Sequence, residues 1–350
     1  MARVMVVFGG RSGEHDVSLA SARAILTALR ESGRHEVVPV GITREGRWIP
    51  ENPMRELESR SRQLAGTAGV AISSPPAPVS DKLPMNLGSV DVVFPVLHGP
   101  YGEDGTIQGM LELAGVPYVG SGVLASAMGM DKISMKKIFA HHDLPQVEWV
   151  GLTRNEWKND RPEWTRKIAK TLGYPCFVKP ANLGSSVGIN KSTDDTELQQ
   201  ALDAAAELDR RVIVEAGVDA REIEVAVLGN EAPEVSAPGE ILVSDNDFYD
   251  YEAKYVEGGS KLEVPANVPE NVLEEIKTIA RTAYAAIDAA GMARVDFFLE
   301  RGTERLLINE INTIPGFTPT SVYARLWDAS GLPYDQLLDR LISLALERHA

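Results

Sequence analysis

The sequence RVDFFLERGTERLLINEIN, residues 294–312, decides the fold class. Two apolar, β-branched and aromatic runs flank a glycine-containing turn, which is typical of two paired strands. Because side chains two residues apart in a strand share a face, Arg294 and Asp296 are predicted to point the same way, and so are Glu310 and Asn312. The stretch therefore predicts a sheet with charged groups gathered on one face.

The same face is a candidate metal site. Asp296, Glu310 and Asn312 carry hard oxygen ligands of the kind that Mg²⁺ prefers, and carboxylates brought together without a cation are costly to bury. An arginine–carboxylate ion pair on a solvated face would explain any single pair of these residues. The apolar flanks and the continuation TIPGFTPTS, residues 313–321, favour the metal site.

A second informative stretch is VKPANLGSSVG, residues 178–188. Lys179 precedes a glycine- and serine-rich loop whose backbone N–H groups and hydroxyls could cradle phosphate. The lysine comes before the glycines, so this is not a P-loop, and a hairpin turn is the usual explanation of such a loop alone. Lys132 and Lys254 are two further cations available to a polyphosphate.

The amino-terminal third is predicted to be a parallel α/β sheet. A buried strand at 4–8 runs through Gly9 and Gly10 toward a helix at 18–30, and a strand at 90–97 ends in the polar sequence HGPYGEDG. Ligands of doubly wound sheets lie at such carboxyl ends. The other elements predicted here are strands at 35–42 and 117–119, a helix at 106–114 and a helical stretch that contains Asp131 and Lys132.

Beyond about residue 145 the pattern becomes antiparallel. A stretch rich in Trp, Asn and Lys at 155–163 indicates a change of domain, and a tyrosine-rich polar loop occupies 245–259. A loop of that length is usually functional or disordered. The predicted elements are strands at 176–179, 212–215 and 222–228, and helices at 196–208, 270–290 and 334–348.

Composition excludes several classes of partner. Lys and Arg total 35 against 50 Asp and Glu, which gives a formal charge of −15. Such a charge repels nucleic acid and anionic membrane surfaces. Cys176 is the single cysteine, so no disulfide framework exists, and the apolar run at 4–8 is too short for a signal sequence or a membrane span. We therefore expect a cytoplasmic protein that binds neither nucleic acid nor membrane.

Seven motifs, taken together, identify a family. In chain order they resemble the D-alanine:D-alanine ligases of the ATP-grasp superfamily. The resemblance implies an α/β, three-domain ATP-grasp architecture, with a Rossmann-like parallel-sheet domain at 1–133, a central domain at 134–222 and a catalytic domain at 223–350 that carries the loop 245–259. The motifs are GGRSGEHDVS (9–18), HGPYGEDG (98–105), MDK (130–132), VKPANLGSSVG (178–188), FYDYEAKY (248–255), RVDFFL (294–299) and NEINTIPGFTPTS (309–321).

The resemblance also implies a nucleotide site and a metal site. ATP would lie between the central and carboxy-terminal domains, with Glu215 near adenine and Glu222 near ribose. Two Mg²⁺ or Mn²⁺ ions would be held by Asp296, Glu310 and Asn312. The residues implied for ATP binding are Lys132, Lys179, Ser185, Glu215, Ala216, Val218, Glu222 and Lys254.

The implied reaction joins two D-alanine molecules into D-alanyl-D-alanine, a peptidoglycan precursor, through a D-alanyl phosphate. Glu14 would bind the ammonium of the first D-alanine; taken alone, it would read as an ordinary acid at a helix N-terminus. Arg294 and the Gly316 N–H would stabilise the tetrahedral oxyanion. The remaining residues implied for substrate binding or catalysis are Ser185 and Tyr255, hydrogen-bonded with Glu14, His98 near the first substrate, and Ser321 and the Val322 N–H at the carboxylate of the second. Family members suggest a homodimer.

Three rival interpretations remain open. A D-alanine:D-lactate ligase or another ATP-grasp carboxylate–amine ligase would share most of these motifs, although Tyr255 favours the dipeptide-forming type. A nucleotide-binding regulator that had lost catalysis should have lost some of Arg294, Asp296, Glu310 or Lys254, and all four are present. A pure interaction module explains none of the clustered polar residues.

Overall fold

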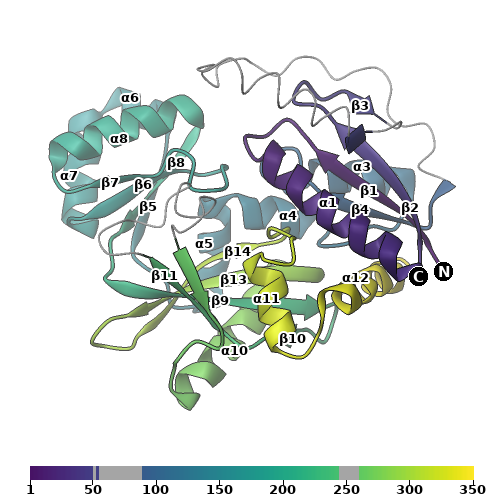
Figure 1. The fold of residues 1–350 in the computed structure, drawn as a ribbon. Coiled ribbons are helices and arrows are strands. Elements are labelled where there is room, and N and C mark those ends of the chain that lie inside the picture. The colour runs from purple at the N-terminus through teal and green to yellow at the C-terminus, as the bar shows by residue number, and fades with distance from the viewer. Residues whose placement is uncertain (50–52, 55–88, 244–259) are drawn as a thin grey trace.

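The computed structural model describes residues 1–49, 53–54, 89–243 and 260–350. Within these ranges the chain forms three sheets with helices packed against them (Figure 1). None of the helices in the described ranges combines the length and the apolar character that a membrane crossing requires.

The amino-terminal sheet has the order β3-β2-β1-β4. Its predicted parallel core is confirmed, because β1 (Arg3–Gly9) pairs in parallel with both β2 (Glu36–Ile42) and β4 (Val92–Val96). The edge strand β3 (Trp48–Ile49) was not predicted. It pairs antiparallel with β2, so this sheet is mixed. The helices α1 (His15–Ser32) and α3 (Thr106–Ala114) pack against it, whereas Ala125 of α4 (Val123–Met130) belongs to the apolar core of the largest sheet.

The third strand predicted for this sheet, at 117–119, was wrong. The segment makes one isolated parallel bridge, between Val93 and Tyr118. Pro117 has no N–H to donate, so the pairing is limited to Val93 N to Pro117 O at 2.8 Å and Val119 N to Val93 O at 2.9 Å. The helical stretch around Lys132 is also two helices, because Asp131 adopts an extended conformation and caps α5 (Lys132–His141) by accepting from Ser134 N at 2.8 Å.

The central sheet is antiparallel, with the order β5-β8-β6-β7. Helices cover one face of it (Figure 1), and Trp157, Ile168 and Leu198 pack there against Val178 and Val214. Strand alternation turns the neighbouring side chains to the opposite face. The elements are β5 (Trp149–Thr153), β8 (Arg211–Ala216), β6 (Cys176–Pro180), β7 (Asn190–Ser192), α6 (Arg154–Asn159), α7 (Arg161–Leu172) and α8 (Asp195–Leu208).

The segment at 155–163, interpreted from sequence as part of a change of domain, lies in α6 and α7 and the turn between them. Thr153 and Glu156 form a capping box that begins α6, and Asp160 caps α7 by accepting from Glu163 N at 3.2 Å. These short polar caps interrupt the apolar periodicity on which helix prediction depends.

The largest sheet has the order β12-β11-β9-β13-β14, with β10 paired to β9. It contains the hairpin predicted from residues 294–312, although β13 begins earlier, at Gly291. The helix predicted at 270–290 ends at Ala286, where Asp288 has a φ of 61°. The elements are β9 (Ala220–Gly229), β10 (Glu234–Val235), β11 (Gly239–Val243), β12 (Ser260–Glu263), β13 (Gly291–Glu300), β14 (Leu306–Asn312), α10 (Glu270–Ala286), α11 (Val322–Ala329) and α12 (Tyr334–Arg348).

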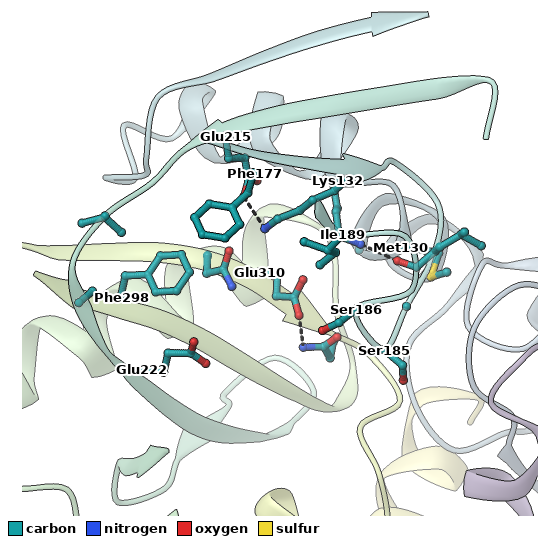
Figure 2. Close-up of a pocket in the computed structure, with 18 of the residues that line it drawn as sticks. Met130, Lys132, Phe177, Ser185, Ser186, Ile189, Glu215, Glu222, Phe298 and Glu310 are labelled. Atoms are coloured by element: carbon teal, nitrogen blue, oxygen red, sulfur yellow. Dashed lines mark hydrogen bonds and ion pairs between the residues drawn. The ribbon is translucent and has the colours of Figure 1, made fainter. Parts of the chain in front are cut away.

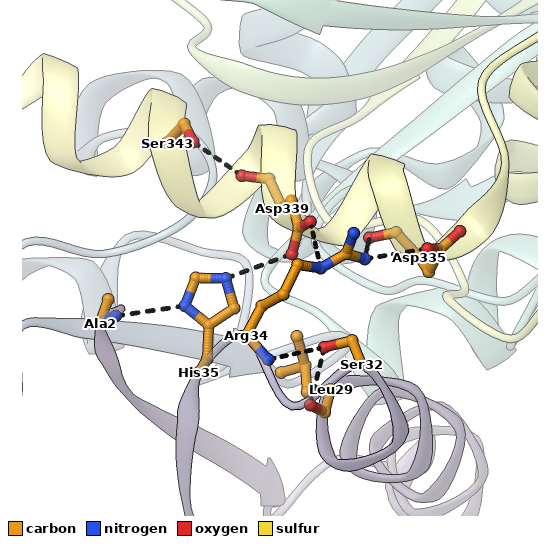
Figure 3. Close-up of polar contacts among 8 residues, drawn as sticks. All are labelled: Ala2, Leu29, Ser32, Arg34, His35, Asp335, Asp339 and Ser343. Carbon is orange, nitrogen blue, oxygen red and sulfur yellow. Dashed lines mark hydrogen bonds and ion pairs between the residues drawn. The ribbon is translucent and has the colours of Figure 1, made fainter.

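The two ends of the chain pack together through α1 and α12. Ile25 of α1 and Leu337 of α12 belong to one apolar core. Beside it, Arg34 Nη2 lies 2.8 Å from Asp335 Oδ2, and His35 Nε2 lies 3.2 Å from Asp339 Oδ1 (Figure 3). Partly exposed ion pairs of this kind contribute little free energy, so burial of the apolar residues is what mainly stabilises the packing of α1 against α12. The predicted domain limits remain predictions.

Candidate functional site

A pocket lies between the central sheet and the largest sheet (Figure 2). Lys132 of α5 and Lys179 of β6 line it together with Glu310 of β14. One loop, residues 182–188, borders it between β6 and β7. Nine of the residues implied by the family resemblance line this pocket: Lys132, Lys179, Ser185, Glu215, Ala216, Val218, Glu222, Glu310 and Asn312.

Two lysines share one buried carboxylate at the inner wall of the pocket. Lys179 Nζ lies 2.5 Å from Glu215 Oε2, and Lys136 Nζ lies 3.1 Å from Glu215 Oε1. Burial opposes ionisation of Glu215, but the two lysines outweigh it and lower its pKa to about 2. Burial alone would lower the pKa of Lys179, but the negative charge of Glu215 outweighs burial and raises it. Lys136 was not predicted, although it lies one helical turn after Lys132.

The glycine- and serine-rich loop is held to α5 at its start. Lys132 Nζ donates to Leu183 O at 2.7 Å, and Lys132 N donates to Ala181 O at 3.0 Å. Asn182 Nδ2 donates to Asp131 Oδ2 at 2.7 Å, which anchors the loop from the other direction. Ser185 has a φ of 48°, so the backbone there is in the left-handed region that ordinary residues seldom adopt. Such outliers cluster at ligand sites.

The predicted metal ligands lie together at the far side. Asp296 of β13 is paired in register with Glu310 of β14, and Asn312 Nδ2 donates to Asp296 Oδ2 at 3.0 Å and to Glu310 Oε1 at 3.4 Å. The ion pair considered from sequence is also present, because Arg294 contacts Asp296 at 2.6 Å and Glu224 at 3.0 Å. Two carboxylates and one amide on a shared face fit a hard divalent cation, because an amide can turn its oxygen toward it.

Aromatic rings supply the apolar part of the pocket. Phe177 on β6 and Phe298 on β13 project into it from the two sheets (Figure 2). Neither residue was predicted to lie at the site. Both could have been found by alternation, since Phe177 is two residues from Lys179 and Phe298 is two residues from Asp296.

A second cluster joins the pocket to the amino-terminal sheet. Ser185 Oγ donates a hydrogen bond to Glu14 Oε1. A Cβ at Gly99 would lie 2.5 Å from Glu14 Oε2, and one at Gly184 would lie 2.8 Å from it. Both glycines therefore make room for the Glu14 carboxylate. His98, also buried, donates from Nδ1 to Ile314 O at 3.0 Å, while its Nε2 has no hydrogen-bond partner within the described part of the chain.

Burial sets the charge state of this second cluster. It lowers the pKa of His98, although the charge of Glu14 opposes the shift, so this imidazole is neutral at pH 7. Burial and the charge of Glu14 raise the pKa of Glu103 well above its ordinary value. Glu103 lies in the predicted motif HGPYGEDG but was not predicted to line the pocket, as it does.

The residues implied for the second substrate lie at the start of α11. Ser321 is the N-cap residue, and its Oγ accepts from Thr318 N at 3.0 Å. The next N–H is that of Val322, the first residue of the helix, and such N–H groups attract carboxylates. A Cβ at Gly316 would lie 3.4 Å from Ser321 Oγ, so Gly316 is close to this cap. The predictions for Lys254 and Tyr255 lie outside the described residues.

A mixed amino-terminal sheet, two antiparallel sheets and a pocket that combines lysines with paired acids define an α/β ligase of the ATP-grasp type. Family comparison makes this specific. Residues 3–121 match the D-ala D-ala ligase N-terminus and residues 138–343 match the D-ala D-ala ligase C-terminus. The chain belongs to the D-alanine–D-alanine ligase family. The resemblance drawn from the seven motifs, and the enzyme class that it implied, are therefore confirmed.

Individual relatives agree over nearly the whole chain. A D-alanine–D-alanine ligase of Geobacillus thermodenitrificans is 48% identical over 99% of this chain and 96% of its own. The solved D-alanine–D-alanine ligase of Coxiella burnetii has a TM-score of 0.79 at 35% identity, covering 99% of this chain and 94% of that one. The VanG D-Ala:D-Ser ligase of Enterococcus faecalis has a TM-score of 0.80 at 34% identity, covering 98% and 99%.

Proposed function

We propose that the protein joins two D-alanine molecules at the expense of ATP, releasing ADP and phosphate. The observation that carries the proposal is the position of Ser185, which lines the nucleotide pocket and also donates to Glu14. One residue thus links the lysine-lined pocket to a buried carboxylate suited to an ammonium group. Phosphoryl transfer from nucleotide to amino acid requires this proximity.

In the nucleotide half, the base would lie among the apolar residues of the pocket, with Glu215 accepting a hydrogen bond from the adenine amino group. Glu222, with Ala216 and Val218 nearby, would contact the ribose side. Lys132 and Lys179 would contact phosphate oxygens, and Lys254 is proposed as a third phosphate contact. Phosphoryl transfer depends mainly on such positioning and electrostatics.

The metal half is proposed from the donor set. Asp296, Glu310 and Asn312 would hold two Mg²⁺ or Mn²⁺ ions that neutralise negative charge on the ATP oxygens. Arg294 forms ion pairs with Asp296 on its own strand and with Glu224 on β9. Its guanidinium therefore stays oriented within the site.

The amino acids would occupy the second cluster. Glu14 would bind the ammonium of the first D-alanine, beside His98, and the carboxylate of this substrate would accept the γ-phosphoryl group. The second D-alanine, its carboxylate held by Ser321 and the Val322 N–H, would attack the acyl carbon with its deprotonated amine. The C–O bond to phosphate then breaks, and phosphate leaves with that electron pair. Arg294 and the Gly316 N–H would stabilise the intervening oxyanion, with Ser185 and Tyr255 completing the site around Glu14.

The identity of the second substrate is the most specific part of this proposal. A relative of the same fold is a D-Ala:D-Ser ligase, so the fold alone does not fix that choice. A D-alanine:D-lactate ligase is the alternative carried from the sequence. The dipeptide is proposed because Tyr255 follows Lys254. A cytoplasmic site of action and a homodimer are proposed as well.

Phosphate release tests the proposal. Purified protein with MgATP should release phosphate in the presence of D-alanine and form D-alanyl-D-alanine, while L-alanine should give only background release. D-serine and D-lactate, each added with D-alanine, identify the accepted second substrate by the mass of the product. Release that ignores the configuration of alanine would contradict the proposal.

A further inference from the structure

Lys136 is a buried cation to which the proposed reaction gives no role. Its side chain is 0% exposed, whereas the next residue, Lys137, is on the exposed side of α5. Lysine is almost never fully buried unless it has a charged partner, because removing an ammonium group from water is costly. The partner here is Glu215, the carboxylate proposed to recognise adenine.

The geometry gives Glu215 two cations, one on each oxygen. Lys179 approaches Oε2 from the neighbouring strand, and Lys136 approaches Oε1 from the helix behind. Glu215 is in register with Phe177, so Lys179 is its diagonal neighbour on the same face of the sheet. Lys179 lines the pocket, but Lys136 does not. The carboxylate can therefore lose one cation to a ligand and keep the other.

We propose that Lys136 is a positioning residue for the nucleotide, which keeps Glu215 paired so that Lys179 can leave this carboxylate and contact a phosphate group. The inference rests on the proposed function, in which Lys179 binds ATP phosphates and Glu215 binds the base. Without Lys136, the same movement of Lys179 would leave a buried carboxylate with no cation, which is strongly unfavourable. Lys179 would then stay on Glu215.

A purely structural role for Lys136 makes a different prediction. Loss of packing or of helix position would weaken the binding of every adenine ligand to a similar extent. Loss of the cation weakens only the part of the affinity that the phosphates contribute. The ratio of the dissociation constants of adenosine and of a non-hydrolysable ATP analogue, here called the triphosphate increment, separates the two.

Calorimetric titration of the whole protein with both ligands gives this increment. In Lys136→Met we expect it to fall about tenfold or more, the value of one charge-assisted hydrogen bond, with adenosine binding much less affected. Lys137→Met, on the exposed side of the same helix, should keep the wild-type increment. Equal weakening of both ligands in Lys136→Met, or an unchanged increment, would overturn the inference.

A double variant tests the cause. Lys136→Met with Glu215→Gln removes the carboxylate that would otherwise retain Lys179, so the increment should recover toward wild type even though adenosine binds less well. No recovery would overturn the inference. If Lys136→Met does not fold, Lys136→Gln, which keeps a polar side chain without the charge, replaces it with the same expectation. Wild-type protein without a triphosphate increment would instead contradict the proposed function itself.

Discussion

Ser185 and Glu14, 171 residues apart in the chain, are joined by a hydrogen bond from the serine hydroxyl to the carboxylate. Ser185 belongs to the loop that borders the nucleotide pocket, and Glu14 directly precedes α1 of the amino-terminal sheet. The bond therefore connects the part of the site that would hold phosphate with the part that would hold an ammonium group.

Glu14→Gln should lower kcat/KM for D-alanine roughly 10- to 100-fold, because a neutral amide replaces a charge-assisted acceptor for the ammonium group. The affinity for ATP in the absence of D-alanine should stay near the wild-type value. Asp16→Asn, two residues along and exposed, is the matched control and should behave as wild type in steady-state kinetics. Equal losses in the two variants would remove Glu14 from the substrate site.

Gly99→Ala should damage the site more than it damages the fold. Its φ is 69° and the new Cβ would lie 2.5 Å from Glu14 Oε2, so the carboxylate must move. Gly115→Ala is matched in backbone strain, with a φ of 62°, but nothing lies within 4 Å of its Cβ. Both variants should lose about 1 kcal/mol of unfolding free energy from that strain.

Thermal melting should show a similar loss of stability in the two glycine variants, and D-alanine kinetics should distinguish them. Gly99→Ala should lose at least about tenfold in kcat/KM for D-alanine, since a misplaced carboxylate no longer meets the ammonium group. Gly115→Ala should keep its activity. Full activity in Gly99→Ala would show that Glu14 tolerates displacement and has no precise role.

Glu310→Gln should raise the Mg²⁺ concentration needed for half-maximal phosphate release by about tenfold or more, because it removes one of two carboxylates from the proposed ligand set. The measurement is a magnesium titration at saturating ATP and D-alanine. Glu304→Gln, in the exposed turn of the same hairpin, should leave the titration unchanged. An identical magnesium dependence in Glu310→Gln would contradict the assigned ligands.

Acid should weaken the fold through Glu215. The two lysines lower its pKa from 4.5 to about 2, so its ionised form stabilises the folded state above pH 4.5 and that contribution is lost as pH falls toward 2. The contribution is of the order of 3 kcal/mol. Chemical denaturation between pH 6 and pH 2.5 should show a shallower fall in unfolding free energy for Lys136→Met with Glu215→Gln than for wild type. Parallel curves would mean that the pKa of Glu215 is the same in the folded and unfolded states.

Sequence patterns predicted the elements whose side chains alternate or repeat regularly. The hairpin at 294–312 was confirmed because strand alternation and a glycine turn define it locally. Its pairing also contains an irregularity after Asp296, where Phe297 is opposite Ile308 and Asn309 is skipped. A bulge of this kind depends on the partner strand, so alternation within one strand cannot reveal it.

Site residues were predictable where a reactive side chain lies in a recognisable motif. They were not predictable where the role of a residue depends on its burial in the folded protein. Lys136 was missed because a lysine on a helix ordinarily lies in solvent. Its burial comes from Glu215, which is 79 positions away and on another element. Glu103 was missed for the same reason, since its raised pKa follows from burial and from the charge of Glu14. Contacts between distant segments set both properties.

In the proposed reaction, the two clusters joined by Ser185 and Glu14 activate the carboxylate of the first D-alanine by phosphorylation. D-alanine labelled with ¹⁸O in its carboxylate tests this directly, by mass spectrometry of the phosphate released during dipeptide synthesis. We expect one ¹⁸O atom in each phosphate, because the bridging oxygen of the acyl phosphate comes from D-alanine and leaves with phosphorus. Dipeptide formed with unlabelled phosphate would contradict it.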